Sequence, residues 1–299
     1  MERLRLAAVV IVCVVGLCGV AWANPGTTSA LNGVEDVYTG YLPPPGFHFI
    51  DYVLFYDANK IMDANGKAIP GTDAVVIADA LRFIYSSNVE ILGGRAAWHA
   101  VVPLVHKDIT TPGFKKTVSG VGDMYLSPLL IGWDLPEDFH IIGAVDTILP
   151  IGEYDSNEPV NVGSNHYTIE PVIAVTKIFP DSGLVLDGKF MYDMHTRQSD
   201  TMVRTGNQFH VDYAVTMPVT KADSPLRVGV NGYYFTSLEE DKLNGADIAN
   251  SKEKVFAAGP MARYDFSPQT SLTFKAQFET DAHNRPEGSA FWLKFVQSF

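Results

Sequence analysis

The sequence predicts an all-β fold: a transmembrane, antiparallel up-and-down β-barrel of about twelve strands, with short periplasmic turns and longer extracellular loops. Four observations support this class. Extended segments of about ten residues with alternating apolar and polar side chains recur through residues 47–299. The connections between these segments differ in length in a regular way, and an export signal precedes them. The chain after that signal contains no amphipathic helix of convincing length.

Residues 1–23 have the layout of a cleaved secretory signal peptide. Two arginines give a positive start, an uninterrupted apolar run follows from Leu6 to Val20, and Ala21-Trp22-Ala23 is a small-x-small cleavage site. We therefore expect export and cleavage after Ala23. An uncleaved anchor helix is the alternative, and it is disfavoured because the apolar run is shorter than the roughly 20 residues that a span needs.

The composition excludes several classes of protein. With 46% hydrophobic and 19% charged residues, the chain is not intrinsically disordered. Both cysteines, Cys13 and Cys18, lie in the signal segment, so the mature chain cannot form disulfides, iron–sulfur clusters or thiolate zinc sites. Cleavage removes one of 34 acidic and two of 22 basic residues, leaving 33 and 20. A chain this acidic repels phosphates, so we expect no nucleic-acid partner.

Residues 24–46 form a lead rich in glycine and proline. Its run Leu42-Pro43-Pro44-Pro45-Gly46 cannot continue a helix or a strand inside a sheet. The predicted organisation is thus a signal peptide at 1–23, this lead at 24–46 and a barrel at 47–299. The lead either enters the barrel as a plug or extends into the periplasm, and its composition fits both.

Twelve strands are predicted from the alternation. They are 47–57, 75–85, 95–105, 122–133, 140–151, 166–179, 184–194, 206–219, 226–236, 254–266, 271–280 and 289–299. In the eighth, Phe209 and Val211 share one face while His210 and Asp212 share the other. The facing is ambiguous in the first, second, fourth and ninth strands, and Asp79 falls on the otherwise apolar face of the second. Alternation alone also fits a soluble sandwich or a lipocalin-like barrel.

The lengths of the connections favour the outer-membrane class. Four connections, after the fourth, sixth, eighth and tenth strands, are short: 134–139, 180–183, 220–225 and 267–270. Those on the other side are mostly longer and more polar, for example 58–74, 152–165 and 237–253. On the side of the short turns, 86–94, after the second strand, is of intermediate length. Short turns at one end and long loops at the other, with an even strand count, are typical of outer-membrane barrels.

The last strand also predicts an outer-membrane location. It ends on Phe299, and Phe291, Leu293 and Phe295 lie on one face of it. An apolar, alternating last strand that ends in an aromatic residue is the usual address for the bacterial outer-membrane assembly machinery. We therefore expect that machinery, outer-membrane lipids and lipopolysaccharide as partners.

Several turn motifs recur in order along the predicted strands. They include Pro44-Pro45-Gly46, Gly120-Val121-Gly122-Asp123, Leu149-Pro150-Ile151-Gly152, Arg204-Thr205-Gly206, Gly259-Pro260 and Asn284-Arg285-Pro286. In these motifs and their order the chain resembles the MetA-pathway phenol-degradation family of outer-membrane proteins, which are often found near aromatic catabolism genes. The resemblance implies a barrel that passes or binds small hydrophobic, often aromatic, molecules. It supplies no mechanism-defining residue.

If the apolar face of each strand meets lipid, the polar face lines the lumen. The side chains predicted to line it and meet a ligand are Arg82, Arg95, His99, Asp187, Lys189, Asp193, Gln208, His210, Asp212, Arg263, Lys275 and Glu279. Opposite charges are nearly balanced in this set, and an unpaired charge in a confined site is costly. We therefore expect ion pairs across a narrow barrel with a limited path for a mostly neutral ligand. The alternative is that the charges only brace the wall.

The sequence contains no recognisable catalytic site. His210 is followed by Val211-Asp212 and lacks the His-x-Ser-Asn pattern of outer-membrane phospholipase, and no Gly-x-Ser-x-Gly elbow or phosphate loop is present. No two histidines form a His-x-x-x-His pair. We expect no enzyme activity, no cofactor and no metal. The predicted function is an outer-membrane channel or transporter for small hydrophobic or aromatic compounds, linked to aromatic catabolism. A barrel enzyme acting on lipid and a soluble periplasmic β-sheet binding protein are the alternatives.

Overall fold

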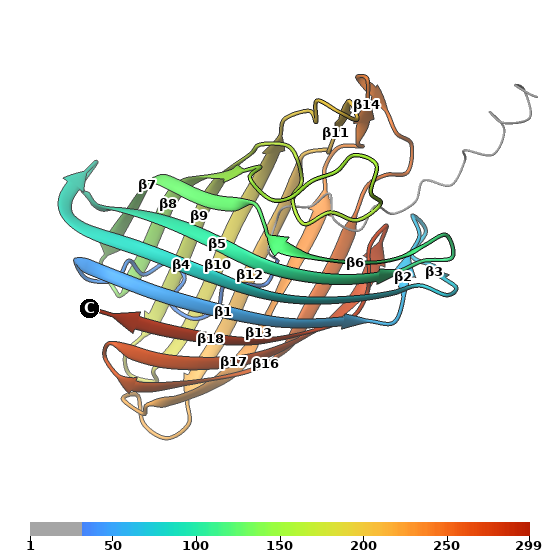
Figure 1. The fold of residues 1–299 in the computed structure, drawn as a ribbon. Coiled ribbons are helices and arrows are strands. Elements are labelled where there is room, and N and C mark those ends of the chain that lie inside the picture. Colours follow the sequence, from blue (N-terminus) through green and yellow to red (C-terminus); the bar gives the residue numbers. More distant parts are fainter. Residues whose placement is uncertain (1–31) are drawn as a thin grey trace, which may run out of the picture.

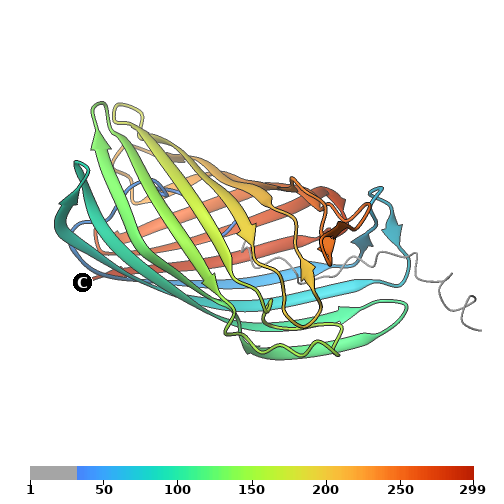
Figure 2. The ribbon, with the colours of Figure 1, turned by 90° about the horizontal axis from the view of Figure 1, so that it is seen from above.

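Twelve long strands, each antiparallel to both of its neighbours, close into one barrel (Figure 1, Figure 2). The structure is a computed structural model, and it describes residues 32–299. The strands are β1 (Gly46–Ala58), β4 (Asp73–Ile91), β5 (Gly94–Thr110), β7 (Met124–Leu135), β8 (Phe139–Leu149), β9 (Thr168–Phe179), β10 (Leu184–His195), β12 (Gln208–Pro218), β13 (Leu226–Ser237), β16 (Lys254–Ser267), β17 (Thr270–His283) and β18 (Ser289–Ser298). The ladder between β1 and β18 joins the two ends of the ring. The predicted fold class is confirmed.

The connections differ between the two ends of the barrel. At the end that holds Phe299 they are turns of two to seven residues, and long connections gather at the opposite end (Figure 1). One expectation was wrong: 86–94 is not a loop, because β4 runs to Ile91 and β5 starts at Gly94. The remaining turn is Leu92-Gly93, with φ of 54° and 74°. Positive φ at both central residues is what a type I′ hairpin turn requires, and leucine at the first position conceals this turn in the sequence.

An additional strand, β6 (Lys115–Val121), lies in what the sequence predicted as a connection. β5 is long enough to pair with β7 over Arg95–Val101 and with β6 over Leu104–Thr110. The connection between β8 and β9 closes the wall beside β6. In this connection, the carbonyl oxygen of Asn161 accepts a hydrogen bond from Lys107 Nζ of β5 at 3.0 Å. The extracellular half of the barrel wall next to β5 is therefore formed by β6 and by the connection between β8 and β9.

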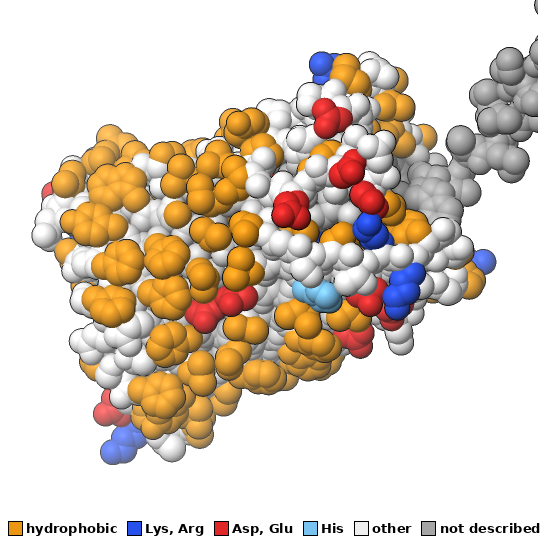
Figure 3. Space-filling model, viewed as in Figure 1, with side chains coloured by type: hydrophobic (Ala, Val, Ile, Leu, Met, Phe, Trp, Pro, Cys, Tyr) orange, Lys and Arg blue, Asp and Glu red, His pale blue; other side chains and the backbone are white. Residues whose placement is uncertain are grey.

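The outward faces of the strands form an apolar belt. Phe55 and Ile77 are exposed at 46% and 44%, and Phe190 at 42%, although each belongs to a long strand. Figure 3 shows hydrophobic side chains covering this part of the surface, with charged groups concentrated toward the long connections. A belt of this kind is the surface that meets lipid in outer-membrane barrels.

The inward faces are not uniformly polar. In β1, Ile50, Tyr52 and Leu54 point inward and pack with Ala78 and Trp292 in one buried cluster. The sequence left the facing of β1 ambiguous, and the structure shows that its apolar side chains point into the barrel. Most of the predicted polar positions elsewhere also point inward, so the barrel has an apolar sector and a charged sector.

Five two-residue strands lie in the long connections. They are β2 (Ile61–Met62), β3 (Ala68–Ile69), β11 (Val203–Arg204), β14 (Lys242–Leu243) and β15 (Ala246–Asp247). They pair as β2 with β3 and as β11-β14-β15, so two loops at this end are folded hairpins. Within residues 32–299, no helix is long and apolar enough to cross a membrane.

Candidate functional site

The interior of the barrel holds a segment of the lead, which we call the inner segment (residues 33–45). Asp212 on β12 accepts hydrogen bonds from the amides of Gly33 at 2.8 Å and Glu35 at 2.9 Å. Farther along, Gly40 N donates to Thr176 Oγ1 on β9 at 2.8 Å. The inner segment thus runs along the inner wall between these strands. Residues 24–31 of the lead, and the signal peptide with its predicted cleavage site, lie outside the described residues.

Glu35 of the inner segment lies among three cations of the wall. Its carboxylate is 2.6 Å from Arg82 Nη1, 3.8 Å from Lys189 Nζ and 3.7 Å from Lys294 Nζ. All of these side chains are largely shielded from solvent. Buried charges are stable only when paired, so Glu35 neutralises a wall that would otherwise repel itself.

Asp36 completes this charged layer. It is 2.9 Å from Lys294 Nζ and 3.2 Å from Lys275 Nζ, and Lys275 also donates to Val34 O at 2.6 Å. Neither Glu35 nor Asp36 was predicted from the sequence to line the lumen. One signal was available: they are the only two charged residues in the lead, 24–46.

Two predicted arginines hold the periplasmic part of the inner segment. Arg95 donates to Leu42 O and Pro43 O, both at 2.8 Å. The guanidinium of Arg263 lies 5.4 Å from the ring centre of Tyr38 and pairs with Asp265 at 2.7 Å. These arginines therefore brace the inner segment and leave little freedom for contact with a ligand.

The other predicted residues also point inward, and most have protein partners. Asp187 accepts from Thr39 N at 3.1 Å and from Thr176 Oγ1 at 2.5 Å. His99 Nδ1 lies 2.7 Å from Arg82 Nη2, and its Nε2 lies 3.3 Å from Asp146.

Three further predicted residues complete this set of inward-pointing side chains. Glu279 accepts hydrogen bonds from the hydroxyls of Tyr56 and Tyr233. Gln208, beside Asp193 in the β10–β12 ladder, is buried, and so is His210, two residues further along β12.

Three cavities follow one another along the barrel. One of about 240 Å³ opens toward the long connections, one of about 40 Å³ lies at the charged layer, and one of about 880 Å³ opens toward the short turns. Tyr125 lines both the first and the second, whereas Glu35 and Arg82 line both the second and the third. The inner segment and its ion pairs thus separate an outer cavity from a wide vestibule.

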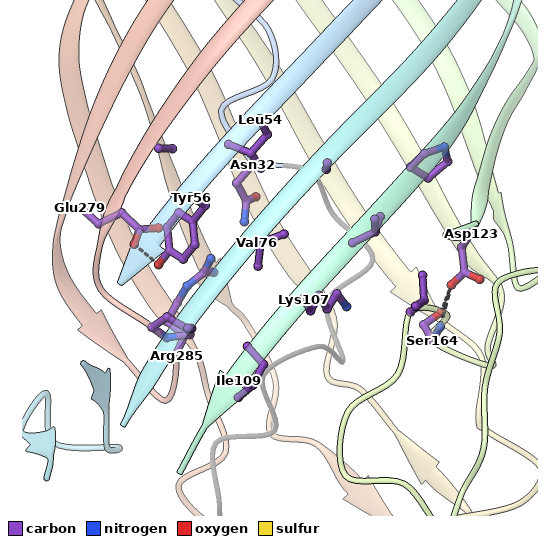
Figure 4. A pocket seen from close by; sticks show the side chains of 18 of the residues that line it. Asn32, Leu54, Tyr56, Val76, Lys107, Ile109, Asp123, Ser164, Glu279 and Arg285 are labelled. Atoms are coloured by element: carbon purple, nitrogen blue, oxygen red, sulfur yellow. Dashed lines mark hydrogen bonds between the residues drawn. The ribbon is translucent and has the colours of Figure 1, made fainter. Parts of the chain in front are cut away.

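The outer cavity has mostly apolar walls (Figure 4). Its apolar lining residues include Leu54, Val76, Ala78, Val105, Ile109, Val162 and Trp292. Polar groups stand at a few points of the wall: Lys107 bonds to a loop carbonyl, and Asp123 accepts from Ser164 Oγ at 2.5 Å. Three of these residues, Leu54, Val76 and Ala78, belong to strands whose facing was ambiguous in the sequence. Among the twelve predicted lining residues, only Glu279 reaches this cavity.

Comparisons with known proteins extend this description. A family model described as "Putative MetA-pathway of phenol degradation" matches residues 58–295. The structure is similar to the COG4313 outer membrane channel from Pseudomonas putida F1, with a TM-score of 0.78 and 14% identity over 89% of this chain and 100% of that chain. It is also similar to the β domain of the Bordetella autotransporter BrkA, with a TM-score of 0.52 and 9% identity over 86% of this chain and 100% of that chain. No curated protein matches the chain.

Proposed function

Because the chain belongs to the MetA-pathway phenol-degradation family, whose model spans residues 58–295, we propose that it is an outer-membrane channel for small, uncharged aromatic or apolar molecules. The observation that carries this proposal is the outer cavity. Binding sites for small molecules are concave and mostly apolar, with a few polar groups that fix orientation. The outer cavity has this composition and faces the extracellular end.

The polar groups of the outer cavity suit a phenol-like ligand. Tyr56 and Glu279 form a hydrogen-bonded pair of 2.6 Å at one side, and Lys107 stands on another strand (Figure 4). In the proposed binding mode, the hydroxyl of an aromatic ligand forms a hydrogen bond with the Tyr56–Glu279 pair or with Lys107, while its ring contacts Val76 and Ile109. A charged solute would gain nothing from the apolar wall and would face the charged layer below.

Passage to the periplasm requires the inner segment to move. Among the described residues, a 40 Å³ cavity beside Glu35 and Arg82 lies between the outer cavity and the vestibule. A space of this size holds about one water molecule and no aromatic ring. In the proposed mechanism the described arrangement is the closed state, and the inner segment shifts toward the wide vestibule during transport.

The similar structures support a channel in preference to an enzyme. One is an outer membrane channel from Pseudomonas putida F1, and the other is the β domain of an autotransporter. The proposal therefore includes no catalytic step. It also includes export by the signal peptide and recognition of the last strand by the assembly machinery. Phe299 supports that recognition, because it is 76% exposed at the periplasmic end, beside Phe47.

A binding experiment tests the outer cavity. Val76 lines it, whereas the next residue of β4, Ile77, is 44% exposed on the outward face. We expect saturable phenol or toluene binding to the full chain in detergent, measured by equilibrium dialysis. Val76→Phe should weaken this binding because the new ring fills the cavity, and Ile77→Phe is the matched control. Absence of saturable binding to the unaltered chain, or equal binding by the two variants, would contradict the proposal.

A further inference from the structure

Three side chains that could hold a metal ion meet on the inner wall. Glu170 on β9, Asp193 on β10 and His210 on β12 come from three neighbouring strands and are at most 2% exposed. His210 Nε2 lies 3.3 Å from Asp193 Oδ2 and 3.4 Å from Glu170 Oε2. One atom from each residue lies within 4.8 Å of the other two.

Within the described residues, the polar side-chain atoms of Asp193 and His210 lack hydrogen bonds. Neither carboxylate oxygen of Asp193 and neither ring nitrogen of His210 makes a hydrogen bond of acceptable geometry. Buried polar atoms are nearly always bonded, and each exception needs an explanation. The next inward residue of β12, Asp212, shows the contrast, because two backbone amides satisfy it. Asp193 and His210 are instead directed at one another and at Glu170.

The spacing of the three atoms is that of ligands around one ion. Zinc–nitrogen and zinc–oxygen bonds in proteins are about 2.1 Å long, and tetrahedral ligands at this distance are about 3.4 Å apart. The two measured separations from His210 match this value. One imidazole and two carboxylates also form a ligand set that divalent transition metals accept.

We propose that Glu170, Asp193 and His210 bind a divalent transition-metal ion, for which Zn²⁺ is the appropriate probe. The 40 Å³ cavity, lined by Glu170 and His210, has room for a water molecule as the fourth ligand. Two carboxylates and a neutral imidazole carry a charge that such an ion balances, while Lys189 and Arg82 of the same cavity remain paired with Glu35. The ion would link β9, β10 and β12 beside the charged layer, a role independent of the ligand in the outer cavity.

The competing arrangement is a protonated His210 held between the two carboxylates. The two arrangements differ in a measurable way, because only one binds a metal. The full chain in detergent is stripped with a chelator, loaded with Zn²⁺, separated from free ion and measured for bound zinc. Heat-modifiable gel mobility establishes that each variant is folded.

We expect one zinc per chain in the unaltered protein and in His106→Ala, a control at the extracellular part of β5 where His106 contacts Ser119. The near-isosteric variants Asp193→Asn and Glu170→Gln should bind Zn²⁺ at least about tenfold more weakly. Zn²⁺ should raise the thermal unfolding temperature of the unaltered chain and not that of Asp193→Asn, because ligand binding stabilises the folded state. Failure of the unaltered chain to retain zinc, or equal retention by folded Asp193→Asn, would overturn the site in favour of the proton-bridged cluster.

Discussion

Glu35 of the inner segment and Arg82 of β4 form a buried ion pair in which Oε1 and Nη1 are 2.6 Å apart. Breaking one side of a buried pair leaves an uncompensated charge and costs about 3–5 kcal/mol. We therefore expect Glu35→Ala to destabilise the seated inner segment and to raise ion conductance in planar bilayers. Glu137→Ala, at an exposed turn acid, is the control. Unchanged conductance in Glu35→Ala would show that the pair does not hold the channel closed.

Gly40 seats the inner segment against the wall. A Cβ atom at this position would lie 2.5 Å from backbone atoms of Val175 and Thr176. Gly40→Ala should therefore force the segment away at a cost of about 1–3 kcal/mol, and protease cleavage of the inner segment should become faster. Gly120→Ala is the control, since its nearest neighbour is a flexible Glu153 side chain at 3.4 Å. Equal cleavage of both variants would contradict the close approach at Gly40.

The sequence predicts those parts of the structure in which apolar and polar residues alternate along a strand. The twelve strands were recognisable because lipid on one side imposes an apolar residue at every second position. The inner segment has no such period, so the pairing of Glu35 with Arg82 was not predictable. The cluster of Glu170, Asp193 and His210 depends on the register of the two ladders that join β9, β10 and β12, which single-strand patterns do not specify. The apolar outer cavity was missed because β1 and β4 carry small or apolar residues on both faces.

Two carboxyl groups meet on the lipid-facing surface. Asp51 on β1 and Asp79 on β4 occupy diagonal positions of the ladder and contact each other through their side chains. Like-charged cross-strand neighbours destabilise a sheet by about 0.2–1 kcal/mol. Asp79→Asn should therefore raise the free energy of unfolding in lipid vesicles by an amount of this order. Asp57→Asn, exposed at the extracellular end of β1, should produce no such gain. A destabilised Asp79→Asn would indicate that the pair has a favourable role.

The connection between β17 and β18 is pinned by Glu287. Its carboxylate is 2.6 Å from Lys60 Nζ and accepts from Ala282 N at 3.0 Å. Burial opposes ionisation, but these partners hold the pKa of Glu287 below its usual value. A depressed native pKa gives stability that is present above the unfolded value of about 4.3 and is lost as pH falls through the native pKa.

Glu287→Gln should accordingly speed hydrogen exchange in this connection at pH 7 and have little effect in acid. The change in free energy should stay below about 1 kcal/mol, because Lys60 is partly exposed. A double-mutant cycle with Lys60→Met isolates the pair. An effect of Glu287→Gln that is the same at both pH values would rule out the charge as its cause.

The most direct test of the central claim is uptake of a panel of aromatic and alkane compounds by a deletion strain, with and without the restored protein. The account predicts faster uptake of small neutral aromatics when the unaltered chain or Ile77→Phe is present, and reduced uptake with Val76→Phe. Equal uptake of every compound with and without the protein would contradict a channel function.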